Sequence, residues 1–157
     1  MTLTAISVYS PAWPIDRKRL EGIDTSTVKL TQNPDVWLAD LLWHCLSLRD
    51  LEGEGGWVVG GDFNLSETFD SWNKKPRGNL EYLNRMVDLG LTECLREHNG
   101  GLVPTFRNPG DGKVKHQMDH LFVTGNLRSR LRSCLVGPAT VFDAGLSDHL
   151  PIVATFS

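Results

Sequence analysis

The stretch that most restricts the fold is residues 57–64, WVVGGDFN, where a short apolar run ends on two glycines and then on polar residues. Apolar and β-branched residues in so short a run indicate a buried strand. Polar groups that directly follow such a strand are held rigidly, as a reactive site requires. Gly60 and Gly61 leave room for a second backbone or a ligand. If the extended geometry continues, Asp62 and Asn64 share a face and point into one cleft.

Other strands and helices flank this run. Two helices are predicted from apolar residues at helical spacing: one from a start signal at residues 33–35 to about residue 50, and one around residues 80–87 that ends at Gly90. Strands are predicted at residues 3–9, 117–123, 130–136 and 152–156. Loops or turns are expected at residues 13–32, 51–56, 65–78, 97–101 and 108–113. Strands with interposed helices indicate one α/β domain over residues 1–157.

Composition and charge exclude several classes of protein. A net charge of −3 argues against broad attraction to nucleic acid, but the 65–78 loop carries Lys74, Lys75 and Arg77, which either contact a phosphate backbone or form a solvated cluster. The first residues have no cationic segment followed by a long apolar stretch, so we expect no signal peptide, no membrane span and a cytoplasmic location. Three scattered cysteines indicate small reduced core residues; a zinc site on Cys94 and His98 is the weaker alternative.

Polar residues also stand at the borders of other predicted strands. Tyr9 ends the first strand, Asp119 lies in QMDHLFV with His120 pointing to the other face, and Asp148-His149 directly precede the last strand. Each residue taken alone could satisfy a turn. Together, carboxylates and an amide suit a hard divalent cation and a phosphate, and a histidine held by an aspartate can bind a phosphoryl oxygen. The sequence has neither a GxxxxGK[ST] loop nor a GxSxG elbow.

The segments SVYSP, GGDFN, MDHLFV and LSDHLPI resemble, in this order, the later motifs of the endonuclease/exonuclease/phosphatase superfamily, whose fold is DNase I-like and which includes exonuclease III-type apurinic endonucleases. The resemblance implies an α/β fold with mainly one mixed β-sheet and helices on one face, half of the usual four-layer sandwich. It also implies a phosphoester hydrolase that depends on Mg²⁺ or Mn²⁺. A nuclease acting on DNA is favoured over a small-molecule phosphatase.

The resemblance further implies roles for individual residues. Asp62 would orient or deprotonate the attacking water, and Asn64 would hold a phosphate oxygen and help to place Asp62. His149 would bind the phosphoryl oxygen in the transition state, and Asp119 would fix and charge His149. Tyr9 would contact the phosphate or the leaving group. The two other implied positions are Asp148, a metal ligand together with Asp62, and Thr105, in a substrate-side PTF segment.

One part of the family pattern is not found. Family members have two sheets packed face to face, and their first half carries a Glu that is the principal magnesium ligand. This chain resembles only the C-terminal half; Glu21, Glu52 and Glu54 lie in expected loops with no strand before them, and Glu67 follows GDFN. We therefore expect an incomplete enzyme or a catalytically inactive half-domain that binds a partner. A bare sheet face would favour a homodimer or association with the missing N-terminal half, and its candidates are Trp13, Trp57, Ile6, Val8 and Phe156.

Overall fold

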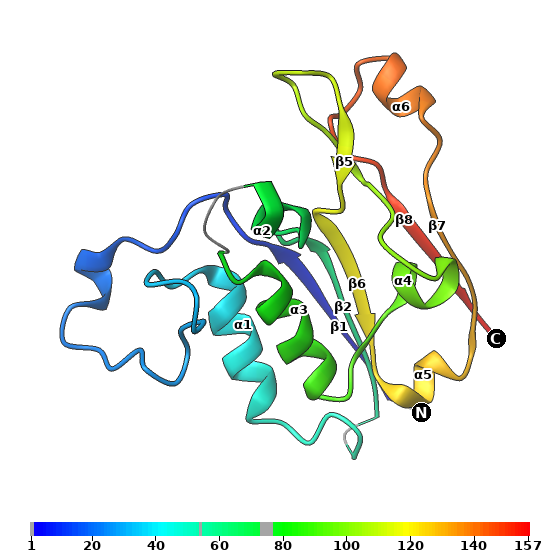
Figure 1. Ribbon diagram of the computed structural model, residues 1–157. Helices are drawn as coiled ribbons and strands as arrows, with labels where there is room; N and C mark the ends of the chain where they lie inside the picture. The colour runs from blue at the N-terminus through cyan, green and yellow to red at the C-terminus, as the bar shows by residue number, and fades with distance from the viewer. Residues whose placement is uncertain (1, 54, 73–76) are drawn as a thin grey trace.

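Figure 1 shows the computed structural model of the chain, which describes residues 2–53, 55–72 and 77–157. The main sheet contains four strands in the order β1 (Leu3–Tyr9), β2 (Gly56–Asp62), β6 (Asp119–Val123) and β3 (Thr92–Glu93). β1 runs parallel to β2, whereas β6 runs antiparallel to both of its neighbours. Two further pairs are β4 (Phe106–Arg107) with β5 (Val114–His116), and β7 (Leu131–Val136) with β8 (Ile152–Phe156). The mixed sheet is confirmed, and the last two strands form a separate ribbon beside it.

Helices α1 (Leu38–Ser47) and α3 (Asn79–Asp88) lie on one face of the main sheet, as expected (Figure 1). Between them and the sheet is a first core that includes Val59, Phe63, Tyr82, Met86 and Phe122. On the other side, α4 (Cys94–Asn99) and the β7–β8 ribbon enclose a second core that includes Cys94, Leu95, Val123, Leu127 and Cys134. The shorter helices are η1 (Arg17–Leu20), α2 (Thr68–Trp72), α5 (Gly125–Arg128) and α6 (Thr140–Asp143). Among the described residues, no helix has the length and apolar character needed to cross a bilayer.

Most of the residues expected on a bare sheet face are in fact covered. Ile6, Val8 and Trp57 pack in the first core, because the alternation along β1 and β2 turns them towards α1 and α3. Phe156 packs against the second core, through the β7–β8 ribbon. Trp13 is exposed but lies in the loop after β1 and not in the sheet. The expectation of a large apolar face built from these residues is therefore wrong.

Several element boundaries differ from those predicted. The Asn33 side chain accepts a hydrogen bond from the Asp35 N–H (3.1 Å) and forms a turn instead of capping a helix, and α1 begins at Leu38. Cys45, expected in the core, is exposed near the end of α1. The short helix α2 lies in the expected 65–78 loop and α4 overlaps the expected 97–101 turn, whereas β4, β5 and α6 lie where no element was predicted. Elements of two to six residues carry too little periodicity to be recognised in a sequence.

The carboxyl group of Asp40 is buried at the start of α1, where it accepts a hydrogen bond from the Trp37 N–H (2.8 Å). Burial raises the pKa of Asp40 from 3.8 to about 6, although the Trp37 N–H and the positive charge of Arg85 act in the opposite direction. The folded chain therefore holds this proton more tightly than the unfolded chain does. In the pH window between these two pKa values, the Asp40 contribution makes the free energy of unfolding fall as the pH rises.

We expect Asp40→Asn to be more stable than the parent chain near neutral pH by ~2–3 kcal/mol, and equally stable at about pH 4. Asparagine keeps an acceptor oxygen for the Trp37 N–H and removes the buried charge. Urea unfolding of both proteins across this pH range measures the difference. Asp88→Asn, at an exposed position in α3, is the matched control. A stability difference between the Asp40→Asn variant and the parent that does not change with pH would contradict the assignment.

Candidate functional site

The register of the main sheet aligns polar residues from three neighbouring strands. Asp62, the last residue of β2, pairs with Tyr9 of β1 on one side and with Asp119 of β6 on the other. Directly paired residues point to the same face, so these three side chains share the face opposite α1 and α3. His149, just before β8, joins them because its Nδ1 lies 2.8 Å from Asp119 Oδ2. Single donor atoms of Asp62, Asp119 and His149 all lie within 4.8 Å of one another.

Asn64 reaches Asp62 through a turn and not by strand alternation. β2 ends at Asp62, and Asn64 has a left-handed backbone with φ of 49°, a conformation that asparagine tolerates well. Its backbone N–H donates to Asp62 Oδ1 (2.8 Å), and its side-chain Nδ2 donates to Asp62 Oδ2 (2.8 Å) and to the Ser10 carbonyl (2.9 Å). Both hydrogens of the amide are thus engaged. The expectation that extended geometry continues past Asp62 is wrong, and the amide positions Asp62 instead of offering a free donor to a phosphate.

Asp119 is held by Thr105 as well as by His149. The Thr105 hydroxyl donates to Asp119 Oδ2 (2.7 Å) and accepts from the backbone N–H groups of Met118 and Asp119 (both 3.1 Å). The Thr105 residue is fully buried, so it offers no surface to a substrate. The expected role of Thr105 as a substrate contact is therefore wrong. Its place in the site is behind Asp119, where it fixes the carboxylate that binds the histidine.

The electrostatic environment changes the acidity of two groups. Burial raises the pKa of Asp62, and the charges of Asp119 and Asp148 add to this effect, against the lowering influence of the Asn64 N–H and of His149. The hydrogen bond to Asp119 raises the pKa of His149, helped by the charges of Asp119, Asp62 and Asp148 and opposed by burial. Asp62 is therefore a stronger base than an ordinary aspartate. His149 keeps its positive charge to a higher pH than an ordinary histidine.

Two predicted site residues lie at the margin of this cluster. The side chain of Tyr9 is next to Asp62 in the sheet and is 64% exposed. Asp148 is exposed, and its carbonyl accepts a hydrogen bond from the Arg107 N–H (2.8 Å). Among the described residues, the group with metal-ligand spacing contains Asp62, Asp119 and His149 but not Asp148. Asp148 is still close enough for its charge to act on both Asp62 and His149.

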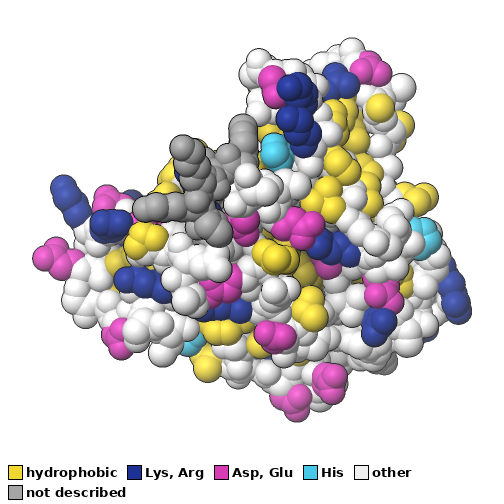
Figure 2. Space-filling view, viewed as in Figure 1, with side chains coloured by type: hydrophobic (Ala, Val, Ile, Leu, Met, Phe, Trp, Pro, Cys, Tyr) yellow, Lys and Arg dark blue, Asp and Glu magenta, His cyan; other side chains and the backbone are white. Residues whose placement is uncertain are grey.

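The predicted basic loop is only partly described. Arg77 is exposed, and its backbone N–H donates to Asp70 Oδ1 (2.8 Å), whereas Lys74 and Lys75 lie outside the described residues. Figure 2 views the molecule from the same side as Figure 1. Over the described surface on this side, dark blue Lys and Arg side chains are scattered among acidic ones, and some lie on the protrusion formed by β5 and α6. This distribution agrees with the slightly acidic net charge of −3.

A buried histidine that the sequence left without a role supports the site from behind. One His120 ring nitrogen, Nε2, lies 3.1 Å from the Leu65 carbonyl, and the other, Nδ1, lies 3.2 Å from Gln117 Nε2. A carbonyl can only accept, so Nε2 carries the hydrogen and Nδ1 accepts from Gln117. Burial lowers the pKa of His120, which keeps the ring neutral. His120 therefore fixes the segment that follows Asp62, and nothing in the sequence pattern signalled this contact.

The chemistry of the cluster fits a hard divalent cation. Magnesium prefers carboxylate and other oxygen ligands, and Asp62 and Asp119 supply two carboxylates side by side. Each Asp62 oxygen accepts one hydrogen bond and keeps a second lone pair, whereas Asp119 Oδ2 accepts two hydrogen bonds, from Thr105 and His149, so Asp119 would bind a metal through its Oδ1. Among the described residues, no glutamate belongs to this group. The carboxylates thus suit Mg²⁺ or Mn²⁺, but this group offers only a few metal ligands among the described residues.

Solved structures identify the fold. An AP endonuclease from Archaeoglobus fulgidus superposes with a TM-score of 0.69 and 20% identity, covering 99% of this chain and 62% of that one. The 3'-5' exonuclease NExo from Neisseria meningitidis superposes with a TM-score of 0.61 and 23% identity, and the match covers 77% of this chain and 52% of that one. The Neisseria 3' phosphatase NExo bound to a product DNA hairpin superposes with a TM-score of 0.57 and 23% identity, and the match covers 76% of this chain and 50% of that one.

No protein-family model matches the sequence, and a search of curated proteins finds no relative. The chain spans only 50% to 62% of the length of these three structures. The likeness shows that the chain shares the DNase I-like fold of these structures.

Proposed function

We propose that this chain carries the catalytic residues of a metal-dependent phosphoester hydrolase, and that its substrate is a nucleic acid, with DNA as the first choice. One observation carries the proposal. Single ligand atoms of Asp62, of Asp119 and of His149, which is hydrogen-bonded to Asp119, lie within 4.8 Å of one another at one end of the main sheet. The names of the similar structures, an AP endonuclease and a 3'-5' exonuclease, support a nuclease over a small-molecule phosphatase.

The two ends of the cluster suit opposite tasks in such a reaction. The Asp62 carboxylate, oriented by two hydrogen bonds from Asn64, accepts a proton from the attacking water, for which its raised pKa is favourable. Asp119 occupies Nδ1 of His149, so the imidazolium turns its other N–H, on Nε2, to a phosphoryl oxygen. Tyr9, which pairs with Asp62 in the sheet, would contact the phosphate or the leaving group. Thr105 and Asn64 act as positioning residues.

Asp62 and Asp148 are the proposed ligands of a Mg²⁺ or Mn²⁺ ion. Asp148 lies outside the group with metal-ligand spacing, but its charge acts on Asp62, and Asp119, paired with Asp62 in the sheet, would supply a further carboxylate oxygen. The bound cation would supply Lewis-acid stabilisation of negative charge on the phosphoryl oxygens. Arg77, together with Lys74 and Lys75, is proposed to contact the phosphate backbone of the substrate.

The proposal predicts metal-dependent hydrolysis by the purified full chain. We expect cleavage of duplex DNA that contains an abasic site or a nick when Mg²⁺ or Mn²⁺ is present, and no cleavage in EDTA. Gel analysis of end-labelled strands measures both, and readdition of the metal must restore the reaction. Cleavage that continues unchanged in EDTA would contradict the metal requirement. The absence of cleavage at high protein concentration would favour the second candidate.

That second candidate is a half-domain that is inactive alone and depends on a partner. It is favoured by the lack of a glutamate in the described donor group and by the 50% to 62% coverage of the similar structures. The proposed partner is a second copy of the chain or a segment equivalent to the part of the similar structures that this chain does not cover. Calorimetric titration with MgCl₂ separates the two candidates, because clear binding to this chain alone argues against dependence on a partner. Light scattering on a size-exclusion column gives the oligomeric state.

A further inference from the structure

Two cysteines lie side by side in the second core, and the candidate site uses neither of them. Cys94 begins α4 and Cys134 lies in β7, and both residues are fully buried. The two elements lie against each other (Figure 1). The Asn99 side chain ties them together, because its Nδ2 donates to the Leu95 carbonyl (2.8 Å) and to the Cys134 carbonyl (3.1 Å). The fold thus brings together two thiols that are far apart in the sequence.

The two thiol groups are hydrogen-bonded to each other. Cys94 donates this bond, which raises the pKa of Cys94, and burial acts in the same direction. The same bond lowers the pKa of Cys134, against the opposing effects of burial and of the Glu93 charge. The thiolate and not the thiol is the nucleophile, so Cys134 is the more reactive of the two. Cys94 is the neighbouring thiol that can resolve an oxidised Cys134.

The contact lies where two parts of the fold meet. In the described part of the chain, β7 and β8 pair only with each other and not with the main sheet. α4 follows directly on β3, which pairs with β6 in the main sheet. A covalent bond between the two sulfurs would therefore connect the β7–β8 ribbon to the main sheet. At present this junction is held by the apolar packing of the second core.

We propose that Cys94 and Cys134 form a redox-sensitive dithiol, which hydrogen peroxide converts to a disulfide that fixes the β7–β8 ribbon to α4. The Cys134 thiolate attacks the peroxide, so that an S–O bond forms, the O–O bond breaks and one water leaves. The Cys94 sulfur then attacks the sulfenic acid on Cys134, the S–S bond forms and a second water leaves. The two thiols lose two protons and two electrons to the peroxide, and a dithiol reductant reverses the change. This inference does not depend on the proposed function.

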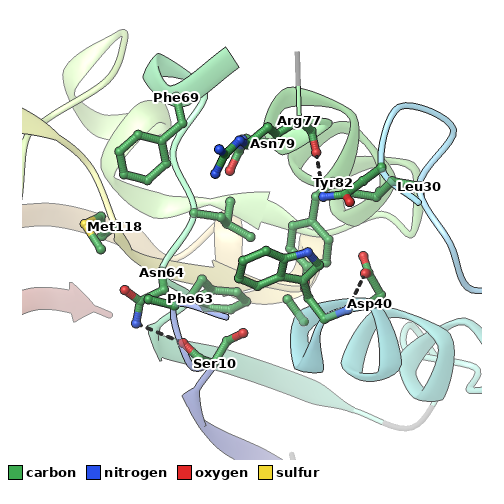
Figure 3. Close-up of a pocket in the computed structure, with 15 residues that line it drawn as sticks. Ser10, Leu30, Asp40, Phe63, Asn64, Phe69, Arg77, Asn79, Tyr82 and Met118 are labelled. Carbon is green, nitrogen blue, oxygen red and sulfur yellow. Dashed lines mark hydrogen bonds between the residues drawn. The ribbon is translucent and has the colours of Figure 1, made fainter. Parts of the chain in front are cut away.

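Burial sets how fast the pair reacts. A cavity of about 410 Å³ opens into the first core, and Figure 3 shows Phe63 and Tyr82 among the side chains that line it. No residue of the second core lines this cavity, so it gives an oxidant no path to the sulfurs. The path is instead a local opening of α4, which has only six residues. We therefore expect oxidation over minutes to hours.

The test is treatment of the full-length Cys45→Ser protein with hydrogen peroxide, since Cys45 is exposed and would react by itself. We expect the intact mass to fall by two hydrogen atoms, and the tryptic peptides 86–96 and 133–157 to become linked. The melting temperature should rise by about 5–15 °C and return to its starting value in dithiothreitol. Free thiols at both positions after prolonged treatment would overturn the proposal. A disulfide that lowers the melting temperature would overturn the fixing of the ribbon.

Oxidation of the unfolded chain is the control for pairing that the fold directs. With all three cysteines present in urea, we expect mixed disulfides that include Cys45, whereas the folded parent should link Cys94 to Cys134. Equal mixtures in both conditions would contradict a preformed pair.

Two single replacements in the Cys45→Ser protein separate the roles of the thiols. Cys94→Ser keeps a hydrogen-bond donor but cannot resolve, so Cys134 should gain one oxygen and react with dimedone as a sulfenic acid. Cys134→Ser should leave Cys94 unmodified under the same conditions. Modification of Cys94 instead of Cys134 would overturn the assignment of the attacking thiol. The peptide map of the chain that keeps both cysteines decides the proposal even if a single variant fails to fold.

Discussion

Replacing Asp62 by asparagine is expected to lower the rate of phosphoester hydrolysis about 10²–10⁴-fold without unfolding the chain. The carboxylate is the proposed base, and its burial and hydrogen bonds from Asn64 prepare it for that role. Asparagine has nearly the same shape but accepts no proton from water. Removing the Asp62 charge also takes away one of the effects that raise the pKa of His149.

The measurement is the maximal rate on the DNA substrate that the parent chain cleaves best, together with a circular dichroism spectrum. We expect the rate at saturating substrate to fall, since water activation is a step of catalysis and not of substrate binding. Asp88→Asn, which changes the charge equally at an exposed position in α3, should retain the parent rate. If Asp62→Asn keeps half or more of the parent activity, Asp62 is not the base.

Gly61→Ala is expected to destabilise the fold by about 3–5 kcal/mol, the largest effect that we expect from adding a single methyl group. Gly61 has a φ of +142°, a backbone conformation that other residues rarely adopt. A Cβ atom at this position would also clash with the carbonyl oxygen of Val8 in the neighbouring strand. Val8 and Gly61 are paired in the sheet one position before Tyr9 and Asp62, so any backbone shift also displaces the site.

Urea unfolding of the variant measures this loss. Gly125→Ala is the control, because Gly125 begins α5 and has no atom within 4 Å of an added Cβ. Alanine in a helix should leave stability unchanged or raise it by up to ~1 kcal/mol. Gly60→Ala should fall between the two, since its added methyl meets the movable side chain of Leu121. A Gly61→Ala protein about as stable as the parent would show that the close approach to Val8 is not a constraint.

The elements best predicted from the sequence are those whose apolar pattern is long or whose borders carry a strong signal. The strands at residues 3–9 and 152–156 and the helix that ends before Gly90 were found close to their observed bounds. The start of α1 was misplaced because Asn33 can cap a turn as well as a helix. The start of α4 could not be read because its N-cap is Glu93, a residue that rarely signals a helix start.

For this protein, the sequence by itself determined which polar residues stand at strand ends, because the apolar run beside each of them must be buried. The tertiary structure alone decided how those residues meet. Sheet register placed Asp119 beside Asp62, and a left-handed turn brought Asn64 back onto its carboxylate. The cavity lined by Trp37 and Tyr82 was equally absent from the sequence pattern. Such contacts join residues far apart in the chain, and their geometry follows from strand pairing and packing, which no local pattern encodes.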